Sequence, residues 1–170
     1  MGGSRKTGTA RTFVLASLAA ILALCSSIAV SRAQDAVEPP TDEEIILDRQ
    51  LAMQQLEEHA DALGGVLAGV EPPEMLAQYT RQVADDAAAA RAAFQAQVPG
   101  GSTKPEAWAN WEDFSRRMDE MVTRTEAMAV AGETGSVGMI NEMVVDALPC
   151  GACHQLYRVP RRPHEPNGAS

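Results

Sequence analysis

Apolar residues recur at intervals of three and four positions in four stretches of this chain, and this pattern constrains the fold more than any other feature. Such spacing places apolar side chains along one face of a helix. Short segments rich in glycine and proline separate the stretches, and the alternation typical of β-strands is absent. Successive helices with short connections pack as antiparallel neighbours. We therefore expect an all-α, antiparallel four-helix bundle over residues 42–158.

Glycine and proline residues set the limits of the four expected helices. The helices are expected at 46–70, at about 74–97, from about 105 to a turn at 132–135, and from about 136 onward. The last helix contains Pro149, and a proline inside a helix removes a hydrogen-bond donor and kinks the backbone. We therefore expect this helix to bend or restart at Leu148-Pro149.

The first 33 residues have the pattern of a signal peptide. A basic start at residues 5–11 precedes an apolar run, Phe13–Val30, and Ser31-Arg32-Ala33 then offers small residues at the positions that signal peptidase requires. We expect cleavage after residue 33 and a periplasmic protein. The alternative is an uncleaved membrane anchor, because the apolar run reaches the lower limit for a spanning helix.

Removal of that segment leaves a strongly acidic chain. It holds four of the 14 Lys and Arg residues and none of the 23 Asp and Glu residues, so 10 cations remain against 23 anions, a net charge of −13. Such a chain is not expected to bind nucleic acid, and it suits a partner with a basic docking face. We expect an acidic lead at 34–41 and a proline-rich, flexible tail at 159–170.

A Cys-x-x-Cys-His motif lies within the last expected helix. Residues three and four apart share a helix face, so Cys150, Cys153 and His154 should point the same way. This arrangement suits one covalently attached haem c, with two thioethers at the porphyrin edge and the imidazole on the iron. Three alternatives are weaker. A redox dithiol would need neighbouring strands, a structural zinc site needs about four ligands, and a disulfide at this spacing would be strained within a helix.

The sequence resembles a known family at three places. The C-terminal motif, followed by Tyr157 and Arg158, is similar to the haem-attachment site of the class II cytochromes c, the cytochrome c′ family. The stretch "DRQLAMQQLEEHADALGGVLAGVEP" resembles the first helix of that family, and "KPEAWANWEDF" resembles the opening of its third helix, where Trp108 also matches. The resemblance extends over most of the chain after residue 33. It implies a four-helix cytochrome with haem near the C-terminus.

The resemblance also implies a role for Met53, which falls at the family's distal-haem position four residues after Arg49. A methionine there gives six-coordinate, low-spin iron suited to electron transfer, as in the c-556-like branch. An apolar residue gives five-coordinate iron that binds nitric oxide or carbon monoxide. We expect His154 and Met53 as metal ligands in an electron carrier, not an enzyme. The alternatives are a gas-binding cytochrome c′, in which Met53 only shields the haem, and a haem-free helical module with a disulfide.

Two arginines are further candidates for haem binding. Arg49 lies on an apolar stripe and would meet a haem propionate there, or else extend to solvent or pair with Asp48 or Asp42. Arg158 would likewise face a propionate or belong to the basic tail. The expected partners are redox proteins, and the resemblance leaves room for a homodimer formed through the first two helices.

The remaining titratable residues carry no clear site. His59 lies about 120° around the first helix from Met53, so we expect it to face solvent. The paired acids, among them Asp85-Asp86, are expected to form solvated helix faces.

Overall fold

The computed structural model describes residues 38–160, all of them helical or in connections apart from one isolated bridge between Thr103 and Arg158. The predicted signal peptide, residues 1–33, lies outside the described residues. The same holds for residues 34–37 of the predicted acidic lead and for 161–170 of the predicted tail. No helix among residues 38–160 is long and apolar enough to span a membrane.

The first helix, α2, covers Asp42–Leu67 and begins at a capping box. The Thr41 hydroxyl accepts a hydrogen bond from the Glu44 backbone N–H at 3.3 Å, and the Glu44 carboxylate accepts one from the Thr41 N–H at 2.8 Å. These bonds satisfy donors that a helix start leaves free. Gly69 follows the end of α2 with a φ of 72°, a backbone conformation that glycine adopts without strain. The first helix was expected to extend to residue 70, but Val70 lies beyond the end of α2 and is 79% exposed.

Among the described residues, the bundle has four long helical segments, called arms here, and α2 is the first. Each of the last two arms is divided into two helices. A short 3-10 turn, Pro73–Met75, leads into α3, Leu76–Ala93. The third arm consists of α4, Pro105–Ala109, and α5, Trp111–Thr134, with a break at Asn110 that the sequence pattern did not predict. The fourth consists of α6, Val137–Ala147, and α7, Cys150–Tyr157. The break that we predicted at Leu148-Pro149 is therefore confirmed.

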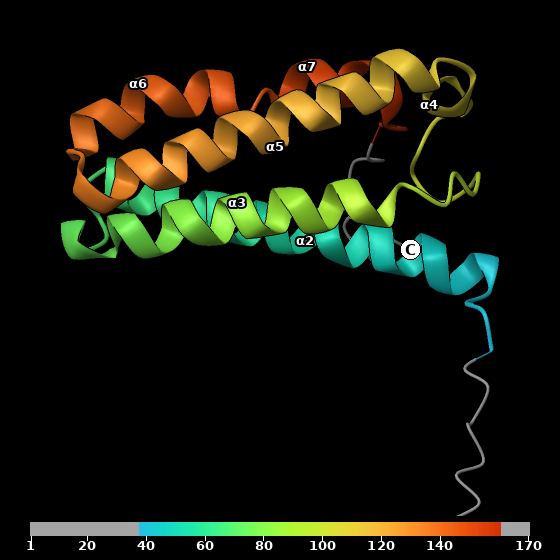
Figure 1. Cartoon of the computed structure of the whole chain (residues 1–170), viewed down its shortest axis with the longest axis horizontal. Coiled ribbons are helices and arrows are strands. Elements are labelled where there is room, and N and C mark those ends of the chain that lie inside the picture. Colours follow the sequence, from blue (N-terminus) through green and yellow to red (C-terminus); the bar gives the residue numbers. More distant parts are fainter. Residues whose placement is uncertain (1–37, 161–170) are drawn as a thin grey trace, which may run out of the picture. The chain divides into compact units, whose positions relative to one another are not determined.

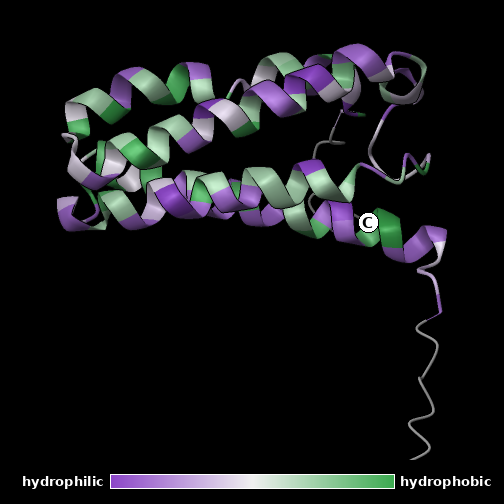
Figure 2. Cartoon of the chain, viewed as in Figure 1, coloured by the Kyte–Doolittle hydropathy of each residue, from purple (hydrophilic) through white to green (hydrophobic). Residues whose placement is uncertain are grey.

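The helices pack in two layers. Figure 1 shows α2 beside α3 in one layer, and α5 beside α6 and α7 in the other. The most extensive packing joins α3 to α5, followed by that of α2 against α3. Figure 2 shows both hydrophobic and hydrophilic residues along every helix, and an amphipathic helix of a bundle places the two kinds on opposite faces. Their apolar faces meet in one core, whose largest completely buried side chains include Leu63, Met128 and Ile140.

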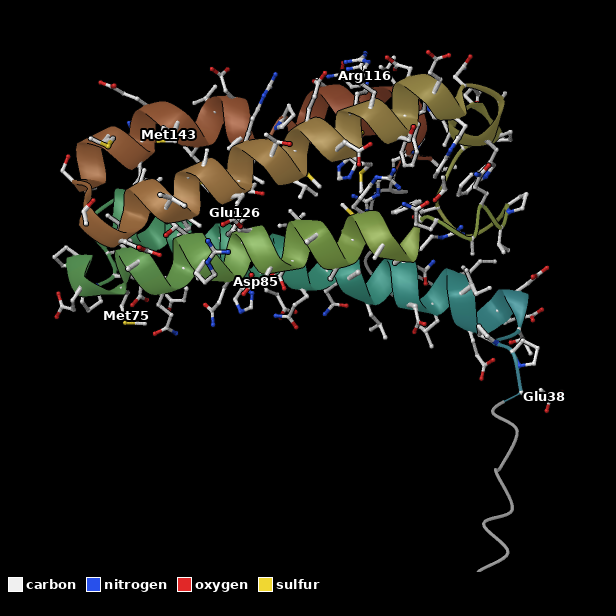
Figure 3. All side chains as sticks on the ribbon, in the orientation of Figure 1. Glu38, Met75, Asp85, Arg116, Glu126 and Met143 are labelled. Carbon is white, nitrogen blue, oxygen red and sulfur yellow. The ribbon has the colours of Figure 1, made fainter. Side chains whose placement is uncertain are left out.

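Ion pairs join α3 and α5 along the outer edge of this contact. Arg81 donates two hydrogen bonds to Glu126, at 2.7 and 2.8 Å, and a longer one to Asp85. Figure 3 labels the two acidic residues, Glu126 on α5 and Asp85 on α3. Arg91 pairs with Asp119 at 2.6 Å nearer the other end of α3. These charges align the two helices, although exposed pairs of this kind contribute little to stability.

Candidate functional site

The helix that carries the Cys-x-x-Cys-His motif begins at the break after α6. Pro149 lies at its N-terminal boundary, and the Pro149 carbonyl accepts the Cys153 N–H at 3.2 Å. At the other end, the His154 carbonyl accepts the Arg158 N–H at 3.0 Å. Proline is well placed here, because a helix start has no use for the missing N–H. The break lets α7 take a direction of its own, separate from α6.

A cavity of about 820 Å³ lies beside α7, within the 300–1,000 Å³ that cofactor sites span. Its lining comes from α2, from the segment 94–103, from α5 and from α7. All six residues that the sequence analysis singled out line it: Arg49, Met53, Cys150, Cys153, His154 and Arg158. Residues more than one hundred positions apart in the chain are thus brought to one enclosure.

Both motif cysteines are free thiols, with Cys150 exposed and Cys153 half-buried. Burial raises the pKa of both thiols above the ordinary value. Catalytic dithiols have a lowered pKa, because the thiolate is the reactive form, and the shift at this pair is in the opposite direction. Among the described residues, no three His, Cys, Asp or Glu side chains converge on a position for a metal ion. Neither the dithiol nor the zinc alternative gains support.

Met53 is half-buried in the wall that α2 contributes and packs against the core. A second methionine, Met118 of α5, lines the same cavity and is only 5% exposed. No role in the site was predicted for Met118. Its helical spacing marked it as inward-facing, and only the position of α5 beside α7 puts it in the cavity wall.

Arg49 is buried, with 2% of its surface exposed. Its guanidinium lies over the rings of Phe94 and Trp108, 5.3 and 5.0 Å from their centroids. It donates hydrogen bonds to the carbonyls of Val98 and Gly100, the latter at 3.4 Å. The expected alternatives, extension to solvent and pairing with acids in its own helix, are therefore wrong. Burial lowers its pKa somewhat, but a guanidinium stays charged at neutral pH.

Tyr157 fastens α7 to α5. It is 7% exposed, and its hydroxyl donates to the Asp113 carboxylate at 2.6 Å. The same carboxylate accepts the Arg117 Nε–H at 2.6 Å. These donors, with Arg117 foremost, hold the pKa of Asp113 well below its usual range, and the hydrogen bond to Asp113 raises the pKa of Tyr157. The Tyr157 ring meets Phe114 edge-on at 5.1 Å and completes an apolar wall of the cavity.

His59 lies outside this site, and our expectation for it is wrong. Its side chain is 24% exposed, and its Nδ1 lies 2.5 Å from the carboxylate of Asp86 on α3, which is itself 14% exposed. The pair joins α2 to α3 instead of facing solvent, because helix rotation turns both side chains toward the interface. The neighbouring acid, Asp85, is exposed as expected.

Comparisons with known proteins identify a family and a fold. The family described as cytochrome C′ matches residues 44–158. A cytochrome c-556 from Agrobacterium fabrum is 32% identical over 72 residues, which are 39% of this chain and 49% of that protein. The match thus spans about half the length of this curated relative.

Solved structures share the fold. Cytochrome c prime from Shewanella frigidimarina has a TM-score of 0.66 at 20% identity, covering 72% of this chain and all of that one. Ferric cytochrome c prime from Alcaligenes xylosoxidans has the same TM-score at 22% identity, covering 73% and 100%. A variant of the Alcaligenes protein in complex with nitric oxide matches equally well, at 22% identity over 72% and 100%.

Proposed function

The chain belongs to the cytochrome c′ family, and we propose that it is an exported electron carrier whose haem iron is held between His154 and Met53. The cofactor of this family is covalently bound haem c, which supplies a one-electron couple between ferrous and ferric iron. One observation carries the proposal. The attachment motif on α7 and the predicted sixth ligand on α2 line the same cavity.

The residues of the cavity fit this cofactor. Cys150 and Cys153 offer two protonated thiols one helical turn apart for the thioether bonds, and His154 follows directly with an imidazole for the proximal position. The donor set is a neutral nitrogen and a soft sulfur, which suits haem iron and does not suit hard cations. Phe94, Phe114 and Tyr157 supply aromatic surface for a flat macrocycle.

The arginines complement the carboxylates that a haem carries. Arg158 lines the cavity at the end of α7 and is half-buried. Arg49 also lines the cavity, and its contacts with two carbonyls leave other N–H groups of its five available. We propose both as counter-ions of the propionates. A cation beside a buried carboxylate offsets the desolvation of the carboxylate, so this pairing would hold the haem in one orientation.

A bound thioether favours electron transfer over gas binding. Met53 would complete the coordination of the iron, and an incoming gas would first have to displace it. His/Met ligation also raises the reduction potential. The second candidate function is gas binding by five-coordinate iron, with Met53 as a shield. Its support is the nitric oxide complex among the proteins of the same fold.

The proposed location and partner follow from the sequence. Residues 1–33 carry the signal-peptide pattern, so we propose a periplasmic carrier. The net charge of −13 after cleavage would steer a redox partner that presents a basic face.

The function is tested by changing each cavity methionine separately. Met53→Leu nearly conserves volume and should cost less than about 1.5 kcal/mol of stability. The ferric protein should change from low-spin to high-spin, and the ferrous form should take up carbon monoxide readily. Met118→Leu is the matched control and should leave the spectrum unchanged. If Met53→Leu has no spectral effect, Met53 is not the ligand, and if only Met118→Leu has one, the thioether comes from α5.

A further inference from the structure

The segment that joins the second arm of the bundle to α4 runs past the cavity, and its residues 98–104 are called here the bridging loop. Residues 100–103 of this loop line the cavity. The loop has contacts with both helices that carry the proposed axial ligands, α2 with Met53 and α7 with His154. The haem-binding residues of the proposed function all lie outside the bridging loop.

Residues of α2 hold the first half of the bridging loop. The Arg49 guanidinium donates to the carbonyls of Val98 and Gly100. Gly100 and Gly101 have φ angles of 131° and 63°, and a Cβ on either would lie less than 3 Å from Ile46, at 2.7 and 2.9 Å. Only glycine lets the backbone approach α2 so closely. A buried cation and a close backbone contact thus fix this half to α2.

The end of α7 holds the second half. The Lys104 N–H donates to the Tyr157 carbonyl at 2.8 Å, and the Val159 N–H donates to the Ser102 carbonyl at 2.8 Å. The Lys104 ammonium adds a hydrogen bond to the Gln155 carbonyl at 2.8 Å. The two backbone bonds make the short antiparallel bridge between Thr103 and Arg158.

The bridging loop is therefore a mechanical link between two helices on different walls of the cavity. The main packing of α7 is against α4, and that of α2 is against α3, so their direct contact with each other is slight. We propose that the bridging loop, held by Arg49, sets the spacing of α2 and α7 at the level of the haem and thereby keeps the Met53 sulfur within reach of the iron. This role rests on the proposed function and makes Arg49 a positioning residue for Met53.

The proposal predicts that cutting the link on either side weakens the sixth ligand. On the α2 side, Arg49→Gln replaces the charged guanidinium with a shorter, neutral amide. Lys104→Pro removes the N–H on the α7 side, and the φ of −69° at this residue already suits proline. Each variant should increase the high-spin fraction of the ferric protein about tenfold. The loss of one charged or buried hydrogen bond would shift the equilibrium between Met53-ligated and unligated iron by about this factor. Each should also speed carbon monoxide uptake and weaken the far-red absorption band.

Two controls separate positioning from general damage. Arg91→Gln removes a comparable arginine, which lies over Trp111 at 5.7 Å and pairs with Asp119 but does not line the cavity, so it should leave the spectrum unchanged. Lys104→Ala removes the side-chain bond alone and should have a smaller effect than Lys104→Pro.

A double variant supplies the deciding measurement. In a Met53→Leu background there is no sulfur to position, so adding Arg49→Gln or Lys104→Pro should change neither the spin state nor the rate of carbon monoxide uptake. An equal acceleration in that background would show that the loop limits access and would overturn the proposal. A low-spin unmutated protein whose spectrum survives both single changes would overturn the linking role alone. A high-spin unmutated protein would overturn this role together with the proposed electron carrier.

Discussion

Replacing Gly132 with alanine should destabilise the bundle. Replacing Gly64, a helix glycine with open space around it, should instead stabilise it. Gly132 lies in α5 where that helix meets α3, and an added Cβ would overlap the Thr80 hydroxyl and lie 3.0 Å from the Thr80 Cβ. Thr80 is completely buried, and its hydroxyl donates to the carbonyl of Leu76 at 2.9 Å. The new methyl group must therefore either separate the helices or rotate that hydroxyl away from its acceptor.

The magnitude follows from two opposing effects. Overpacking a tight contact costs about 1–3 kcal/mol. Alanine in a helix interior gains about 0.5–1 kcal/mol over glycine. The net change for Gly132→Ala should thus be a loss of up to about 2.5 kcal/mol of stability. Gly64 of α2 is the matched control, because nothing lies within 4 Å of a Cβ built there, and Gly64→Ala should gain the propensity term alone.

Urea unfolding of the haem-containing protein measures both changes as shifts of the midpoint at constant slope. Neither Gly132 nor Gly64 lines the cavity, so the haem spectrum should be the same in the wild type and both variants before urea is added. Equal stabilisation by Gly132→Ala and Gly64→Ala would refute the reasoning, because it would mean that α3 and α5 do not approach closely at Gly132.

Three further predictions concern the site. As the pH falls below about 4, the wild type should lose more stability than Asp113→Asn. Arg117 and Tyr157 hold the folded-state pKa of Asp113 below its unfolded value of about 3.9, and the stability that this shift provides is lost when the carboxylate is protonated. Urea titrations at several pH values measure the difference. Haem should remain on the polypeptide after acid-acetone extraction and add the mass of one haem, whereas Cys150→Ser with Cys153→Ser should release it. Electron-transfer rates to a basic partner should fall as ionic strength rises, and rates independent of salt would exclude electrostatic steering.

The bundle and the attachment motif were predictable because local patterns determine them. Helical spacing marks an apolar face whatever the neighbours are, and the proline at position 149 breaks a helix through its own covalent structure. The spacing of Cys150, Cys153 and His154 likewise places them on one face of a single helix. These inferences needed no knowledge of how the helices meet.

Features that depend on contacts between distant segments were not predictable. The sequence did not predict that Arg49 donates hydrogen bonds to carbonyls of a loop some fifty residues later. His59 meets Asp86 only because α2 and α3 are rotated to face each other at that level. Met118 enters the cavity wall through the placement of α5. The break at Asn110 has no adjacent proline or glycine from which it could be predicted.

The absorption spectrum of the purified, unmutated protein tests the central claim most directly. Coordination of iron by His154 and Met53 predicts a low-spin ferric spectrum with the weak far-red band of a methionine ligand. It also predicts slow or weak binding of carbon monoxide by the ferrous form. A high-spin ferric spectrum without that band, together with rapid carbon monoxide binding, would contradict the electron-carrier account and establish this cytochrome c′ as a gas binder.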